Sequence, residues 1–306
     1  MVVESQSSIT QRYLNKFENF GWYTLTFTVI AGVIALLEYT LASGVGLPIF
    51  FEGDPSISYP QQQETLPTLL LLLYYGVIPF AINVVIGYIL YKDKGPHMIV
   101  FYRFVFNYII YFVMCAILTN AFVYLCKNLF LNPRPDFFSR CGYKPYANGI
   151  YGEVGVLGDI TKCSCIKSID NPCSPHLLFD YYSSFPSGHS ANAASFLITS
   201  TFVLLFFIQD IEIALSLKYI IYLCISLISS AAVVYAGATR VWNNRHRPVD
   251  ITAGILIGCV ISYLLFKWAF PNRTGKSNEK ISDQPLCCFQ VYINEPPAVV
   301  VNISDV

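Results

Sequence analysis

The chain has 306 residues, of which 55% are hydrophobic and only 12% are charged, and its mean hydropathy is +0.51. Soluble domains carry about 25% charged residues, so this composition argues against a soluble globular protein. The formal net charge is zero, which excludes the overall positive charge that would attract the chain to nucleic acid.

Six apolar segments follow one another along the chain, and each is long enough to cross a membrane. About 20 apolar residues in a helix span the hydrocarbon core. The predicted spans are residues 22–41, 66–91, 99–126, 190–208, 219–238 and 251–270. The sequence therefore predicts an all-α polytopic membrane protein with one six-helix transmembrane bundle. The predicted division is a cytosolic N-terminal segment (1–21), a six-span domain (22–270) and an irregular cytosolic tail (271–306).

Basic residues near the spans indicate the orientation of the bundle, because cytoplasmic loops are enriched in Lys and Arg. Lys92 and Lys94 lie in the short loop between spans two and three, whereas residues 42–64 contain no basic residue. We therefore expect both termini in the cytosol. The loops on the noncytoplasmic side are then residues 42–65, 127–189 and 239–250. The last two loops are nevertheless rich in Lys and Arg, which favours a chemical role for those residues.

Four of the ten cysteines fall in a single loop that is predicted to face an oxidising compartment. They are Cys141, Cys163, Cys165 and Cys173. Disulfides are expected in such compartments. Four cysteines allow three pairings, and the sequence leaves the choice among them open. A zinc site is the alternative, and the absence of paired C-x-x-C spacing argues against it.

The first motif lies at the end of the third span, in residues 127–135. Lys127 and Arg134 are seven positions apart, which places both on one helical face if the helix continues. Two prolines, Pro133 and Pro135, bias the preceding residues out of the helical conformation. By itself the motif also fits a basic helix end with a proline stop.

The second motif, residues 185–190, directly precedes the fourth span. Ser187 suits a helix N-cap, and Gly188 permits close approach of the backbone to a ligand. Free N–H groups of a first helical turn favour an anion, and His189 would lie at the mouth of that site. An ordinary N-cap with an incidental histidine is the alternative.

The third motif, residues 239–250, links the fifth and sixth spans and contains Arg240, His246 and Asp250. Pro248 suits the first turn of the sixth span. Asp250 follows His246 by four positions, so it is placed to accept a hydrogen bond from the imidazole and to orient it. A basic loop with a capping aspartate is the alternative.

The span count places all three motifs on one membrane face, where three cations, two histidines and one carboxylate suit a tetrahedral oxyanion. The patterns K-x6-R-P, P-S-G-H and R-x5-H-x3-D occur in this order. They resemble the type 2 phosphatidic acid phosphatase superfamily, and most closely its six-span eukaryotic lipid phosphate phosphatases. The resemblance covers the layout of residues 22–270 but is specific only in the motifs. Thr239 stands where the family usually has Ser.

The resemblance implies a metal-independent phosphatase acting on phosphatidate, lysophosphatidate and sphingoid base phosphates. His246 is then the nucleophile that forms a phosphohistidine, Asp250 orients it, and His189 is the general acid. The implied phosphate-binding residues are Lys127, Arg134, Ser187, Gly188 and Arg240. No metal or other cofactor is expected, because the sequence contains no carboxylate cluster suited to Mg²⁺.

Two other functions stay open at this point: a catalytically weak signalling scaffold related to these phosphatases, and a lipid head-group transferase. We expect the protein in the plasma membrane or a secretory-pathway membrane, with the active site extracellular or luminal.

Asp136 is expected to pair with a neighbouring arginine. The chain ends in Ser304-Asp305-Val306, which fits a PDZ-domain ligand with its carboxylate at Val306. The preferred lipid and a homo-oligomeric state are left open.

Overall fold

The computed structural model describes residues 26, 29–34, 36, 48–91, 97–145, 149–164, 175–209, 211 and 213–269. Within this part the regular structure is helical, with two isolated β-bridges, which confirms the predicted all-α class. Five of the described helices are long and apolar enough to cross a membrane, and they correspond to predicted spans two to six. The protein is therefore an integral membrane protein. Most of the first predicted span, the N-terminal segment and the tail with Val306 lie outside the described residues, so their division stays a prediction.

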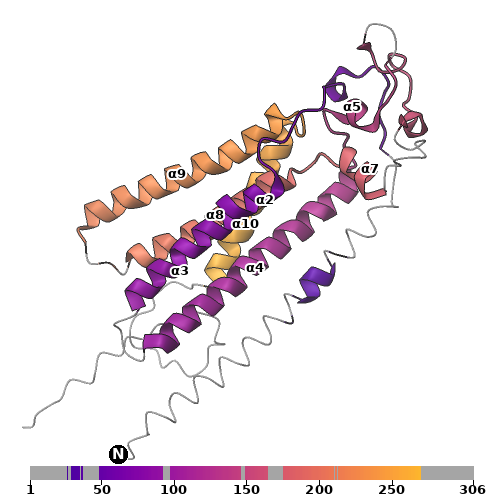
Figure 1. The fold of residues 1–306 in the computed structure, drawn as a ribbon. Coiled ribbons are helices and arrows are strands. Elements are labelled where there is room, and N and C mark those ends of the chain that lie inside the picture. The colour runs from indigo at the N-terminus through magenta and orange to yellow at the C-terminus, as the bar shows by residue number, and fades with distance from the viewer. Residues whose placement is uncertain are drawn as a thin grey trace, which may run out of the picture.

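The membrane-spanning helices run side by side along the length of the molecule (Figure 1). The first described span is continuous through three labelled pieces, and each later span is one helix. Their bounds are α2 (Thr68–Leu71), η2 (Leu72–Val77), α3 (Ile78–Tyr91), α4 (His97–Phe130), α8 (Gly188–Gln209), α9 (Leu215–Trp242) and α10 (Pro248–Ala269). Helix α8 is 67% buried over its span, against 22–28% for the others, and it contacts α4, α9 and α10. It is the central helix of the bundle.

Helices α8 and α10 approach each other closely because α10 presents glycine to α8. A Cβ atom on Gly254 would lie 2.5 Å from the carbonyl oxygen of Ser187, and one on Gly258 would lie 2.4 Å from that of Ala191. Lipid tails offer no hydrophobic drive for helix pairing, so membrane helices associate through such close packing of small residues. The Gly254–Gly258 pair therefore holds the beginning of α10 beside the beginning of α8.

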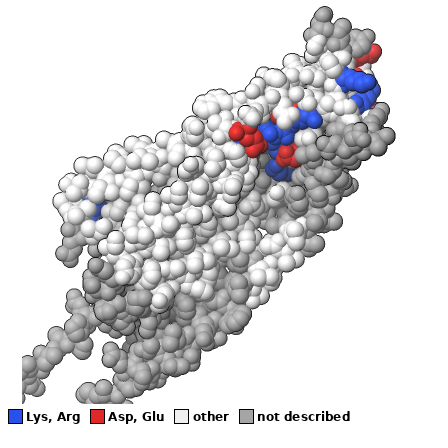
Figure 2. Space-filling view, in the orientation of Figure 1, with Lys and Arg blue, Asp and Glu red and all other residues white. Residues whose placement is uncertain are grey.

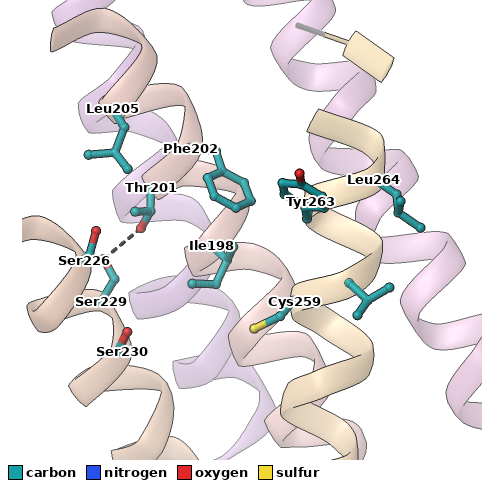
Figure 3. A pocket seen from close by; sticks show the side chains of 11 residues that line it. Ile198, Thr201, Phe202, Leu205, Ser226, Ser229, Ser230, Cys259, Tyr263 and Leu264 are labelled. Atoms are coloured by element: carbon teal, nitrogen blue, oxygen red, sulfur yellow. Dashed lines mark hydrogen bonds between the residues drawn. The ribbon is translucent and has the colours of Figure 1, made fainter. Parts of the chain in front are cut away.

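A groove lies between α8, α9 and α10 within the membrane-spanning part (Figure 3). Its volume is about 390 Å³, and its walls are mainly apolar, with the rings of Phe202 and Tyr263 in edge contact at a centroid distance of 6.2 Å. Thr201 and Ser229 share a hydrogen bond of 2.8 Å at the wall formed by α8 and α9. The groove begins at Ile198, ten residues after Gly188, or about 15 Å along the helix. It is therefore separate from the polar end of the bundle.

A small cap covers one end of the bundle and has its own aromatic core. Its short helices are η1 (Pro55–Ile57), α5 (Phe137–Cys141), η4 (Ile160–Lys162) and α7 (Pro175–Tyr181). Phe50, Phe137 and Phe138 are buried together in edge-to-face contact. A disulfide joins Cys141 to Cys163, with the Cα atoms 5.1 Å apart. The prediction of a disulfide in this loop is confirmed, and Cys165 and Cys173 lie outside the described residues.

Glu52 ties the first cap segment to the disulfide-bonded loop. Its side chain is buried and accepts hydrogen bonds from Lys162 Nζ at 2.7 Å, from the Tyr143 hydroxyl at 2.5 Å and from the Glu153 N–H at 2.7 Å. Burial by itself raises the pKa of Glu52, but the hydrogen bonds from Lys162 and Tyr143 outweigh it and lower the pKa to about 2. The carboxylate therefore remains charged inside the cap.

Candidate active site

The charged side chains gather at the capped end of the bundle, and most of the remaining described surface in this view carries none (Figure 2). At this end α4 and α9 finish and α8 and α10 begin. Backbone and side-chain contacts join the motifs there: the Ser187 N–H donates to the Asp250 carbonyl at 2.9 Å, and Arg247 Nη1 donates to the Pro133 carbonyl at 3.0 Å. The three motifs thus meet on one face, as the span count predicts.

In the first motif the helix ends between Lys127 and Arg134, so it does not continue for the two turns that separate these residues in sequence. Helix α4 ends at Phe130, and Leu131 has a φ of 40°. Lys127 is therefore in the last helical turn, whereas Arg134 lies in the following nonhelical segment, so the conditional expectation of one shared helical face is wrong. The prolines that follow Leu131 explain the early end.

Lys127 and Arg134 are instead held by the segment that precedes α8. Lys127 Nζ lies 3.4 Å from Ser183 Oγ, and Arg134 Nη2 pairs with Asp180. Both basic residues are buried. Arg134 Nε has no hydrogen-bond partner among the described residues. A buried guanidinium N–H without an acceptor is unfavourable, so this donor has an unmet hydrogen-bonding capacity.

The second motif begins α8 as predicted. Ser187 Oγ accepts from the Ser190 N–H at 3.4 Å and from Ser190 Oγ at 3.0 Å, which confirms Ser187 as the helix cap. Gly188 is the first helical residue, so its N–H has no partner inside the helix. His189 Nε2 lies 3.3 Å from Thr68 Oγ1, the hydroxyl at the beginning of α2.

The third motif places Arg240 in the last turn of α9, where its side chain is 1% exposed. Arg240 Nη1 donates to the Leu66 carbonyl at 3.2 Å, and Nη2 donates to Glu64 Oε1 at 3.2 Å. Its Nε, like that of Arg134, has no hydrogen-bond partner among the described residues. Both predicted phosphate-binding arginines therefore keep a buried Nε donor without a hydrogen-bond partner in the described part of the chain.

His246 and Asp250 lie side by side where α10 begins, but their contact is not a direct hydrogen bond. Asp250 Oδ2 is 3.8 Å from His246 Nδ1. The same oxygen accepts from Ser184 Oγ at 2.6 Å and from the Arg247 N–H at 2.9 Å. Ser184 Oγ in turn is 3.4 Å from His246 Nδ1. A serine hydroxyl thus contacts both partners of the predicted pair.

The surroundings of His246 favour its neutral form. Burial lowers the pKa of His246, and the positive charges of Arg134 and Lys127 lower it further, against the opposing effect of Asp250. A histidine with a lowered pKa is unprotonated at neutral pH. One ring nitrogen therefore keeps the lone pair that a nucleophile needs.

Four residues of this site belong to no motif in the sequence reasoning: Glu64, Thr68, Asp180 and Ser184. Asp180 and Ser184 precede the P-S-G-H pattern by only a few residues, so their nearness in sequence was a usable signal. Glu64 and Thr68 lie far from all three motifs in sequence and offered none. Asp136 accepts from Arg140 Nε at 2.6 Å, which confirms the predicted arginine pairing.

Within the described part of the chain, no three His, Cys, Asp or Glu side chains form a group that would hold a metal ion. The observed site consists mainly of hydrogen-bond donors. Charge-assisted hydrogen bonds from such donors are the kind that suit an anion. The metal-independent reaction stays a prediction.

Comparison with known proteins agrees with this geometry. Residues 108–274, more than half of the chain, match the PAP2 superfamily. A PA-phosphatase related-family protein of Dictyostelium discoideum is 26% identical over 84% of this chain, and the match covers 65% of that protein, just under two thirds of its length.

Other relatives match along more of their own length. A probable diacylglycerol pyrophosphate phosphatase 1 of Schizosaccharomyces pombe is 26% identical over 77% of both chains. Phospholipid phosphatase 2 of Rattus norvegicus is 24% identical over 90% of this chain and 99% of its own length. No solved structure matches the chain. The resemblance stated above is thereby confirmed, and the chain belongs to the PAP2 superfamily, in its lipid phosphate phosphatase branch.

Proposed function

We propose that this protein is a metal-independent lipid phosphate phosphatase that hydrolyses phosphatidate and related lipid phosphomonoesters through a phosphohistidine. The observation that carries the proposal is the buried pair of unpartnered Nε donors on Arg134 and Arg240 in the site that contains His246. Unpaired buried donors favour an anionic ligand with several acceptor oxygens, and a phosphate has them.

In the proposed reaction, a neutral ring nitrogen of His246 attacks phosphorus and forms an N–P bond. The bond from phosphorus to the ester oxygen breaks, and His189 gives its proton to the departing alkoxide. Asp250 and the Ser184 hydroxyl orient His246 and stabilise the charge that the ring acquires. Water then attacks phosphorus and gives a proton to His189, which the first step left unprotonated. The N–P bond breaks, His246 becomes neutral again, and inorganic phosphate leaves.

The proposed phosphate cradle uses Lys127, Arg134 and Arg240 as the charged donors. Gly188 supplies a free N–H at the beginning of α8, and the Ser187 hydroxyl, which accepts from Ser190, keeps its own proton to donate. These donors would hold the nonbridging oxygens as charge redistributes during phosphoryl transfer. The rate enhancement would come from positioning of the phosphate and electrostatic stabilisation by these donors, without a metal ion as Lewis acid.

A lipid substrate suits the place of the site at the end of the bundle. A lipid keeps its tails in the hydrocarbon core while its phosphate lies at the interface. The matched relatives include proteins named for phosphatidate-type and diacylglycerol pyrophosphate substrates, which supports the same chemical class here. The Cys141–Cys163 disulfide supports the proposal that this face is extracellular or luminal.

The test is phosphate release from phosphatidate in detergent micelles with excess chelator. We expect the wild type to be active, and His246→Ala and His189→Ala to lose activity while remaining folded. His97→Ala is the matched control, because His97 is the first residue of α4, at the far end of that helix from Lys127. Activity that survives in His246→Ala, or that requires added metal, would contradict the mechanism.

Product analysis separates this function from its rivals. Release of diacylglycerol and inorganic phosphate in equal amounts, with no new phospholipid when an acceptor lipid is added, is the expected result for a hydrolase. Phosphoryl transfer to the acceptor would indicate a head-group transferase. A wild type that is folded but inactive on all lipid phosphates would favour the scaffold function.

A further inference from the structure

Residues 60–68 lie outside all three motifs and outside the part of the chain that matches the family. We call this segment the outer strap. In Figure 1 the indigo chain runs from the cap past the end of α9 and the beginning of α10, and then enters α2. The strap follows this path. It contacts the second motif through Thr68 and the third motif through Glu64.

Glu64 joins two arginines of the third motif. Its Oε1 lies 3.2 Å from Arg240 Nη2 and 3.1 Å from Arg245 Nη2. The next contact along the strap is the Leu66 carbonyl, which accepts from Arg240 Nη1 at 3.2 Å. A guanidinium has five N–H donors in a rigid plane, so fixing both terminal nitrogens fixes its orientation. The unpartnered Nε of Arg240 is thereby held in one direction.

The strap also contacts the ring of His189. Thr68 Oγ1 lies 3.3 Å from Nε2, and in the protonated imidazole both nitrogens carry hydrogen, so the hydroxyl then accepts from Nε2. This contact restrains rotation of the ring about its bond to Cβ. Thr68 thus acts on the residue to which the proposed reaction assigns the proton for the leaving alkoxide.

Two further hydrogen bonds anchor the strap to the turn between α9 and α10. Thr65 Oγ1 is 2.9 Å from Asn243 Oδ1, and Asn244 Nδ2 donates to the Pro60 carbonyl at 2.9 Å. The strap is therefore fixed on both sides of Glu64 to the segment that leads to His246. Its place over the site does not depend on the Glu64 ion pairs alone.

We propose that the outer strap is a fourth positioning element of the site: Glu64 holds Arg240 for substrate phosphate, and Thr68 orients His189 for protonation of the leaving group. The inference rests on the proposed function and assigns separate steps to the two residues. Without Glu64, the guanidinium groups of Arg240 and Arg245 lose their shared carboxylate and repel each other, which weakens phosphate binding. Without the Thr68 hydroxyl, binding stays intact but proton transfer slows.

The experiment compares Glu64→Ala, Thr68→Val and Thr68→Ser with the wild type on two substrates. Phosphatidate has an alkoxide leaving group that needs a proton, whereas 4-nitrophenyl phosphate has a leaving group that departs without one. Gln62→Ala is the matched control, because Gln62 is an exposed residue of the same strap. Thermal unfolding in detergent establishes that each variant is folded, and vanadate inhibition measures oxyanion binding.

For Glu64→Ala we expect KM for both substrates and the inhibition constant of vanadate to rise about tenfold, the effect of one hydrogen bond to a charged group. For Thr68→Val we expect kcat to fall about tenfold on phosphatidate but not on 4-nitrophenyl phosphate, with unchanged vanadate inhibition. Thr68→Ser keeps the hydroxyl and should restore the phosphatidate rate.

Opposite outcomes would overturn the inference. A lower KM in Glu64→Ala would mean that Glu64 competes with phosphate for Arg240. Equal losses on both substrates in Thr68→Val would mean a structural role only, and variants that match Gln62→Ala throughout would show that the strap merely covers the site. A wild type that is inactive, or a His246→Ala variant that is active, would refute the proposed function itself and the inference with it.

Discussion

Replacing Gly258 with alanine tests whether contact between α8 and α10 sets the geometry of the site. In an isolated helix this change is favourable by about 1 kcal/mol, because alanine has the higher helix propensity. In this bundle the new Cβ would lie 2.4 Å from the Ala191 carbonyl oxygen and 2.8 Å from the Ser195 nitrogen. Both are backbone atoms, so no side-chain rotation relieves the clash.

Ordinary van der Waals contact begins at 3.4 Å, so α10 must move away from α8 by about 1 Å. Overpacking of this kind costs about 1–3 kcal/mol. The same movement separates Asp250 on α10 from His189 on α8, and a misplacement of about 1 Å costs roughly 100-fold in rate. We therefore expect Gly258→Ala to lower both the unfolding temperature and kcat/KM.

The assay is thermal unfolding in detergent together with kcat/KM for phosphatidate. Gly32→Ala is the matched control, because the one described atom near a Cβ there is Ile117 Cδ1, at an ordinary 3.9 Å. Gly32→Ala should leave both quantities close to those of the wild type. If Gly258→Ala were as stable and as active as Gly32→Ala, the argument that close helix contact determines the site geometry would be refuted.

Three other changes test the cap and the nucleophile. Ser184→Ala removes the hydroxyl that contacts His246 and Asp250, and should lower kcat about tenfold with little change in KM, as steady-state kinetics would measure. Glu52 has a lowered pKa, so its contribution to the stability of the folded protein is complete above its ordinary pKa of 4.5 and is lost as pH falls towards about 2. The unfolding temperature of Glu52→Gln should therefore depend less on pH over that range than that of the wild type. An unchanged pH dependence would contradict this. Cys141→Ser opens a disulfide between residues 22 positions apart and should destabilise the cap by about 2–4 kcal/mol, measured as faster proteolysis of residues 142–164; equal cleavage rates would mean that the aromatic core suffices.

The prediction of spans two to six succeeded because the hydrocarbon core imposes a length and a composition on any helix that crosses it. Their ends were less accurate. Helix α9 continues to Trp242, beyond the predicted end at 238, and so contains Arg240 in its last turn. A hydropathy pattern fades where polar residues of a site begin, even when the backbone continues as a helix.

The motif residues were identifiable because each has a local reason to be where it is. Ser187 caps α8 and Pro248 begins α10, and both signals lie within a few residues of the helix they begin. The same local pattern suggested a direct contact of His246 with Asp250. The observed distance of 3.8 Å reflects competition, because Asp250 Oδ2 already accepts from Ser184 and from the Arg247 N–H.

The sequence by itself determined the membrane bundle, the common face of the motifs and the basic character of the site, because these follow from apolar length, span parity and residue type. Only the tertiary structure decided which groups hold those residues in place. Glu64 reaches Arg240 across 176 positions of sequence, and Thr68 reaches His189 across 121. Contacts over such separations depend on how the helices pack and where the cap lies, and neither periodicity nor spacing along the chain encodes them.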